Sequence, residues 1–146
     1  MRDYKEAAHL GVIDAEVRRL VHAMNIAQMR TFASCEGHGW LRMNQPPYVC
    51  FVADFAVAAR LANALHRADM TGLPVLQGAW SVRLFGESPD GHKQQFMLAM
   101  TWHGRDFWPA IRRVVRRDLE LLAQLVCTDP GSAAPKAGAL DDLCRD

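Results

Sequence analysis

The strongest constraint on the fold is a hairpin pattern in the second half of the chain. In "WSVRLFGE", residues 80–87, apolar side chains recur at every second position, which is the period of a strand with one buried face. "SPDGHK", residues 88–93, contains a proline and an Asp-Gly pair, and both favour tight turns. "QFMLAMTW", residues 95–102, is of strand length and apolar on both faces. We therefore predict two antiparallel strands, the second of them central in its sheet.

Three stretches have the 3.6-residue apolar period of helices that bury one face. The first begins at Asp14, a suitable N-cap, and ends near Asn25. The second begins after Asp54, and the third begins in "GRDFWP", with Asp106 as its cap and Pro109 in its first turn. The predicted apolar stripes are, in chain order, Val17, Leu20, Val21 and Met24; Phe55, Ala58, Leu61, Ala62 and Leu65; and Ile111, Val115, Leu119, Leu122 and Val126.

Two more strands complete the pattern in the first half of the chain. "RTFASC", residues 30–35, and "YVCFVA", residues 48–53, are rich in β-branched and aromatic side chains. The order α-β-β-α-β-β-α predicts a single α+β domain over residues 1–127, with a four-stranded, mainly antiparallel sheet and helices packed on one face. Residues 128–146 are rich in small residues, proline and charge, which predicts a flexible C-terminal tail.

Charge and hydropathy limit the classes of function. The formal net charge is +1, so bulk electrostatics favour neither nucleic acid nor a membrane, and any basic surface must be local. The longest apolar run is interrupted by Asp54, and the N-terminus lacks the apolar core of a signal peptide. We therefore expect a cytoplasmic protein with no membrane partner, whose four cysteines are reduced.

Candidate chemistry is concentrated in "TFASCEGHGW", residues 31–40. Cys35 and His38 stand at C-x-x-H spacing where the first strand passes into a loop. An imidazole can lower the pKa of a neighbouring thiol and make it a catalytic nucleophile, or both groups can bind zinc, with Cys50 as the nearest third ligand. In the alternative interpretation, Cys35 is a small buried side chain and His38 a loop residue.

The loop at residues 36–47 is longer than a tight hairpin requires and is a candidate binding loop. Trp40 can stack on a base and Arg42 can contact a phosphate, next to Ser34 and Gly37 at the end of the strand. The alternative is that Trp40 folds back on the core.

The last helix carries the basic motif "IRRVVRRD". Its four arginines are i,i+4 neighbours opposite the buried stripe, and such a group can hold the phosphate backbone of RNA. The alternative is a solvated helix face, to which Asp118 and Glu120 contribute. The arginines are Arg112, Arg113, Arg116 and Arg117.

"GVIDAEVRRLVHAMNIAQMRTFASCEGHG", residues 11–39, resembles the N-terminal signature of the wybutosine-synthesising tRNA methyltransferase family. There, a glycine, an aliphatic residue and an aspartate begin a helix that ends near an asparagine, and a strand leads to a Ser-Cys-x-Gly motif. The resemblance implies a shared fold and a site at that motif; the family methylates a modified guanosine in tRNA with S-adenosylmethionine. The family usually has a basic residue where this chain has His38, and the chain shows no glycine-rich adenosylmethionine loop. The matching residues are Gly11, Ile13, Asp14, Val17, Leu20, Val21, Asn25, Thr31, Ser34, Cys35 and Gly37.

Three hypotheses of function follow. The first is an RNA- or nucleotide-binding or modifying protein, favoured by the resemblance and the arginine face. The second is a non-enzymatic binding or regulatory protein that acts as a homodimer. The third is a metal-dependent enzyme using Cys35 and His38. The sequence identifies no cofactor and no substrate.

Overall fold

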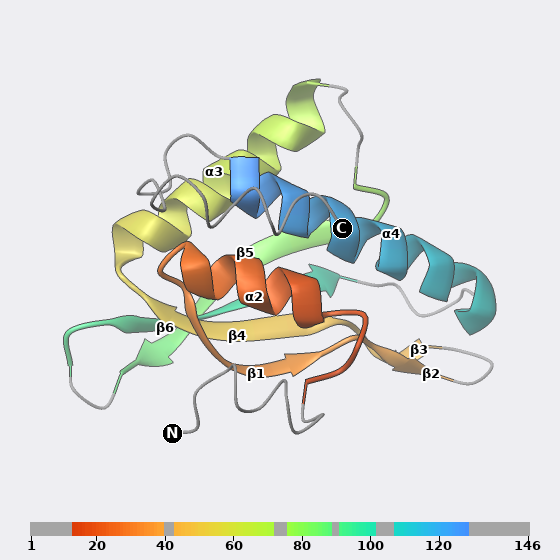
Figure 1. The fold of residues 1–146 in the computed structure, drawn as a ribbon, viewed down its shortest axis with the longest axis horizontal. Coiled ribbons are helices and arrows are strands. Elements are labelled where there is room, and N and C mark those ends of the chain that lie inside the picture. The colour runs from red at the N-terminus through yellow and green to blue at the C-terminus, as the bar shows by residue number, and fades with distance from the viewer. Residues whose placement is uncertain (1–12, 40–42, 72–75, 89–90, 102–106, 129–146) are drawn as a thin grey trace.

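The computed structural model describes residues 13–39, 43–71, 76–88, 91–101 and 107–128 (Figure 1). The expected cap Asp106, the loop residues Trp40 and Arg42, and residues 129–146 of the expected tail lie outside the described residues. The elements are α2 (Arg18–Ile26), β1 (Arg30–Cys35), β2 (His38–Gly39), β3 (Met43–Gln45), β4 (Tyr48–Ala53), α3 (Phe55–Thr71), β5 (Ala79–Glu87), β6 (Gln94–Thr101) and α4 (Trp108–Thr128).

Four strands form one antiparallel sheet in the order β1-β4-β6-β5. The predicted α+β class and the order of elements are confirmed. The strand that was expected to be central, β6, lies between β4 and β5, where both of its edges are paired. The two edge strands each contain a register irregularity, between Thr31 and Ala33 in β1 and between Leu84 and Gly86 in β5.

The helices cover one face of this sheet, and the core lies between the two layers (Figure 1). Val49, Phe51 and Leu98 project from the central strands and are fully buried. The first and third predicted stripes are buried in full. In the second stripe Ala58, Leu61 and Leu65 are buried, whereas Ala62 is half-buried. Phe55 begins α3 and is 63% exposed, and its ring contacts Phe96 at the margin of the core.

The first helix begins later than the sequence predicts. Residues 15–17 form a turn, and α2 starts at Arg18 with no side-chain hydrogen bond at its N-cap, Val17. Asp14 therefore does not cap this helix; its carboxylate accepts the backbone N–H of Glu36 instead. At the other end, Asn25 joins α2 to β1, since its side chain exchanges two hydrogen bonds with Thr31.

Asp118 has a structural role that the sequence interpretation missed. It is fully buried in α4 instead of lying on a solvated face. Its carboxylate accepts the backbone N–H groups of Gln77 at 3.0 Å and Gly78 at 2.7 Å, and the indole N–H of Trp80 at 2.9 Å. A buried carboxylate with three donors is well satisfied, and here it attaches the start of β5 to α4.

An aromatic pair lies outside the core and involves both edge strands of the sheet. Phe32 and Phe85 come from the two edge strands, lie outside the core cluster, and are 40% and 49% exposed. Their ring centroids are 6.3 Å apart. Within the described residues, no helix combines the length and the apolar character needed to cross a bilayer.

Candidate functional site

The "SCEGHG" motif lies at a corner where β1 ends and α4 begins. Gly37 adopts φ +90°, a left-handed conformation that glycine accepts readily. A Cβ at this position would lie 3.1 Å from the ring of Trp108 and 3.2 Å from Pro47. The motif therefore turns tightly against the first turn of α4, which brings residues far apart in the sequence together.

Backbone hydrogen bonds hold the segment before α2 against the same corner. The Glu36 N–H donates to the Asp14 carboxylate at 3.2 Å, and the Glu16 N–H donates to the Glu36 carboxylate at 3.0 Å. Each of these acidic side chains thus accepts an N–H from the other segment. The exchange fixes Asp14 beside the end of β1, although 21 positions separate it from Cys35 in the sequence.

Asp14, Cys35 and His38 form a cluster of potential ligands. One atom from each side chain lies within 4.8 Å of the other two. His38 Nε2 is 3.9 Å from Asp14 Oδ2, and Cys35 Sγ accepts the N–H of Gly37 at 3.3 Å. Cys50, the third ligand expected from the sequence, is not in this group; it is buried in β4 opposite Ala33.

Burial, rather than activation, dominates the chemistry of the thiol. Desolvation raises the pKa of Cys35, the Gly37 N–H lowers it to a smaller extent, and the charges of Asp14 and Glu36 raise it further. The direction is opposite to that expected for a thiol activated by a neighbouring imidazole. Cys35 alone is therefore a poor nucleophile at neutral pH.

The raised pKa of the Cys35 thiol can be tested by alkylation. The pH midpoint for reaction of Cys35 with iodoacetamide in the native protein is expected to lie above the ordinary value of about 8.5, since the folded state favours the protonated thiol. The free energy of unfolding should fall as pH rises above that value. The Cys35 thiol loses its proton at a lower pH in the unfolded chain than in the folded chain, so deprotonation favours the unfolded state. Mass spectrometry of the Cys35 peptide measures the midpoint. A midpoint below that of the urea-unfolded chain would contradict the raised pKa of Cys35 and would show that Cys35 is an activated nucleophile.

The arginines of α4 border a hollow beside this cluster. Trp108, Pro109, Arg112, Arg113 and Arg116 line a surface depression of about 260 Å³. All three arginine side chains are exposed. The fourth arginine of the motif does not line the hollow, so the structure separates the predicted group of four into three and one.

One arginine of the hollow connects it to the cluster. Arg116 donates to Glu16 at 2.7 Å, and the Glu16 backbone N–H binds Glu36, the residue next to Cys35. Within the described part of the chain, no ion pair is found for Arg112 or Arg113. These two guanidinium groups are therefore available to an anionic ligand.

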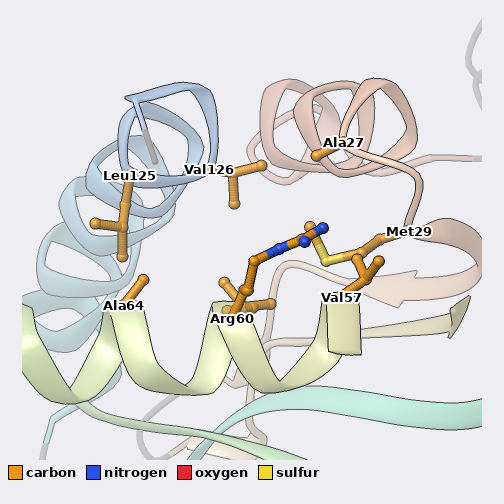
Figure 2. A pocket seen from close by; sticks show the side chains of 8 residues that line it. Ala27, Met29, Val57, Arg60, Ala64, Leu125 and Val126 are labelled. Atoms are coloured by element: carbon orange, nitrogen blue, oxygen red, sulfur yellow. The ribbon is translucent and has the colours of Figure 1, made fainter. Parts of the chain in front are cut away.

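Two other depressions are less suited to a charged ligand. One, of about 400 Å³, lies between α3 and β5, and His66 is its one titratable side chain. The other lies among α2, α3 and α4, where Arg60 extends beside Met29 and Val57 (Figure 2). Its volume of about 20 Å³ is enough for about one water molecule, so we assign it to core packing.

The structure brings together part of the site expected from the sequence. Cys35, His38 and Gly37 meet at one corner, and Ser34 precedes them in β1, where it pairs with Val49. The segment of residues 36–47 is not a simple loop, because β2 and β3 form a two-stranded ribbon within it. Trp40 and Arg42 remain outside the described residues.

Sequence reasoning missed two residues of this corner. The sequence predicts Asp14 as a helix cap, and Trp108 falls within "GRDFWP", where the third helix is expected to begin. Gly37 of the Ser-Cys-x-Gly motif is a sequence sign that another element packs closely there, because a glycine lets a neighbouring element approach the backbone. In the structure that element is α4, through Trp108. No signal in the sequence pointed to Asp14 as a neighbour of Cys35.

Comparison of the chain with models of known families, with curated proteins and with solved structures finds no match. The site is therefore interpreted from its own geometry.

Proposed function

We propose that the protein binds RNA, and that the hollow at the start of α4 holds phosphates of a single-stranded segment. One observation carries the proposal: Arg112, Arg113 and Arg116 line one depression together with an aromatic residue, Trp108. Guanidinium groups bind phosphate oxygens through paired hydrogen bonds. Trp108 lines the hollow as a buried side chain of the core, so the proposal rests on the arginines and on phosphate contacts.

The position of the hollow supports RNA more than an isolated anion. Arg117 continues the exposed basic surface along α4 beyond the hollow, so a ligand with several phosphates can follow the helix. The Ser-Cys-x-Gly motif, on which the resemblance to tRNA-modifying enzymes rests, packs against Trp108 through Gly37. A mononucleotide shares the phosphate chemistry and would occupy the hollow alone.

Salt dependence of binding tests this proposal. Fluorescence anisotropy of a labelled single-stranded RNA oligonucleotide is measured between about 50 and 200 mM salt, and each phosphate contact contributes about 0.7 to the slope of log K against log salt. Replacing Arg112 and Arg113 with glutamine is expected to make the slope shallower by about 1.4 and to weaken binding at low salt. The matched control is Arg83→Gln, which removes an exposed arginine from β5, where it donates to Ser81 and Thr101.

Three outcomes distinguish RNA bound in the hollow from RNA bound elsewhere, from no RNA binding and from a bound mononucleotide. An unchanged slope in the double variant Arg112→Gln/Arg113→Gln, or an equal change in the Arg83→Gln control, would contradict the assignment of RNA to the hollow. Absence of RNA binding at low salt would remove it altogether. Displacement of the RNA probe by an equal concentration of nucleoside monophosphate would reassign the hollow to a mononucleotide.

A further inference from the structure

The acidic, thiol and imidazole groups at the corner offer a donor set that RNA binding does not use. Asp14 lies before α2, Cys35 ends β1 and His38 begins β2, so three separate segments each supply one group. Their oxygen, sulfur and nitrogen atoms lie within 4.8 Å of one another. Thiolate, imidazole and carboxylate are the three side-chain ligands of zinc in proteins.

We infer that Asp14, Cys35 and His38 form a binding site for Zn²⁺ with a fourth coordination position open to solvent. Bonds of about 2.0–2.3 Å in a tetrahedral site place ligand atoms about 3.3–3.7 Å apart. The cluster requires each pair of ligand atoms to approach by about 1.5 Å at most. The exposed side chain of His38 can supply this movement, while Cys35 is buried and fixed.

Backbone hydrogen bonds already orient two of the ligands. The Glu36 N–H donates to Asp14 Oδ2, and the next N–H along the chain, that of Gly37, donates to Cys35 Sγ. Donors of this kind position zinc ligands and are part of most zinc sites. The tight turn at Gly37 is what directs the second N–H toward the sulfur. The two ligands are therefore held by the protein in the absence of an ion.

Charge and exposure select the ion and the type of site. Zn²⁺ would displace the Cys35 proton to solvent, and the thiolate and the Asp14 carboxylate would together neutralise the divalent charge. The sulfur and nitrogen donors disfavour Mg²⁺ and Ca²⁺, which prefer oxygen. The side chains of His38 and Asp14 are 61% and 36% exposed, so water can reach the fourth position. Three protein ligands with an open position are typical of catalytic zinc.

Cobalt substitution tests the site by spectroscopy, independently of RNA. The full-length protein, stripped of metal, is titrated with Co²⁺, which reports thiolate ligation by a near-ultraviolet charge-transfer band and tetrahedral geometry by intense visible bands. We expect one Co²⁺ per chain, displaced by Zn²⁺. The charge-transfer band should persist in the control Cys50→Ser, which alters a buried thiol outside the cluster, and should be absent in Cys35→Ser.

Two solvent-accessible positions, the half-buried Asp14 and the exposed His38, keep the test decisive where Cys35→Ser fails to fold. Asp14→Asn keeps an oxygen acceptor for the Glu36 N–H, and His38→Gln changes an exposed side chain. Each should weaken Co²⁺ binding by more than about tenfold, with an unchanged circular dichroism spectrum. A wild-type protein without the charge-transfer band, a band lost in Cys50→Ser and kept in Cys35→Ser, or unchanged affinity in both of these variants would overturn the assignment. None of these outcomes depends on RNA binding.

Discussion

Replacing Asp118 with alanine is expected to lower the free energy of unfolding by about 3–5 kcal/mol. The variant leaves three donors without their acceptor: the N–H groups of Gln77 and Gly78 and the indole N–H of Trp80. An unsatisfied buried donor costs about 1–3 kcal/mol, so three donors cost about 3–9 kcal/mol, and their partial exposure places the expected loss at the lower end, about 3–5 kcal/mol. Urea unfolding monitored by circular dichroism measures the change.

Glu120→Ala is the matched control on the same helix. Glu120 pairs with Arg19 but is partly exposed, so its loss should cost less than about 1 kcal/mol. If the two variants unfold at the same urea concentration, Asp118 does not hold β5 to α4. A loss of stability confined to the Asp118 variant would establish the carboxylate as the connection between these elements.

Leu20→Ala is expected to destabilise the protein by about 2–5 kcal/mol, the range for a leucine truncated inside a packed core. Leu20 is fully buried in α2, within the same core cluster as Phe51 of β4 and Leu122 of α4. Truncation removes apolar contacts from both layers and leaves a cavity that the surrounding helices fill only in part. Thermal unfolding and urea unfolding should both report the loss.

Leu84→Ala provides a control with the same chemical change. Leu84 lies at the edge of the sheet in β5 and is 58% exposed. Its truncation should change the free energy of unfolding by less than about 0.5 kcal/mol. Equal effects at the two leucines would mean that α2 does not pack on the sheet as described, and the α+β architecture would then be wrong.

Local periodicity predicted most of the fold because each helix and strand must bury one face. The stripe of Val17, Leu20, Val21 and Met24 is a property of α2 alone, and it was buried as expected. The hairpin of β5 and β6 was recognised by alternation and by its turn residues, which are also local. The central position of β6 followed from its apolar character on both faces.

Contacts between distant segments could not be predicted in the same way. Asp14 precedes a helix, and aspartate at that place favours a cap, yet its carboxylate is bound by Glu36. Asp118 lies among arginines, which suggested a solvated face, yet its exact position on the helix turns it inward toward Gly78. Side-chain type alone does not distinguish these roles, because the deciding partners come from elements about twenty and forty positions away.

The sequence predicts a candidate site at the end of the first strand, but it does not predict that Asp14 and Trp108 lie beside it. The C-x-x-H spacing placed Cys35 and His38 together because four consecutive residues at a strand end cannot separate far. The spacing gave no information on the pKa of Cys35, which depends on burial by the folded chain. The hollow at the start of α4 is a surface depression lined by residues of that helix, and nothing in the sequence pointed to it.

Mapping the surface that RNA contacts shows whether the hollow at the start of α4 binds RNA. In an NMR titration of the isotope-labelled protein with a single-stranded RNA oligonucleotide, the backbone amides that shift are recorded residue by residue. RNA bound in the hollow should cause the largest shifts in the first turns of α4, around Arg112, Arg113 and Arg116, and at Gly37 beside Trp108. Shifts confined to the depression between α3 and β5, with residues 108–116 unaffected, would contradict it.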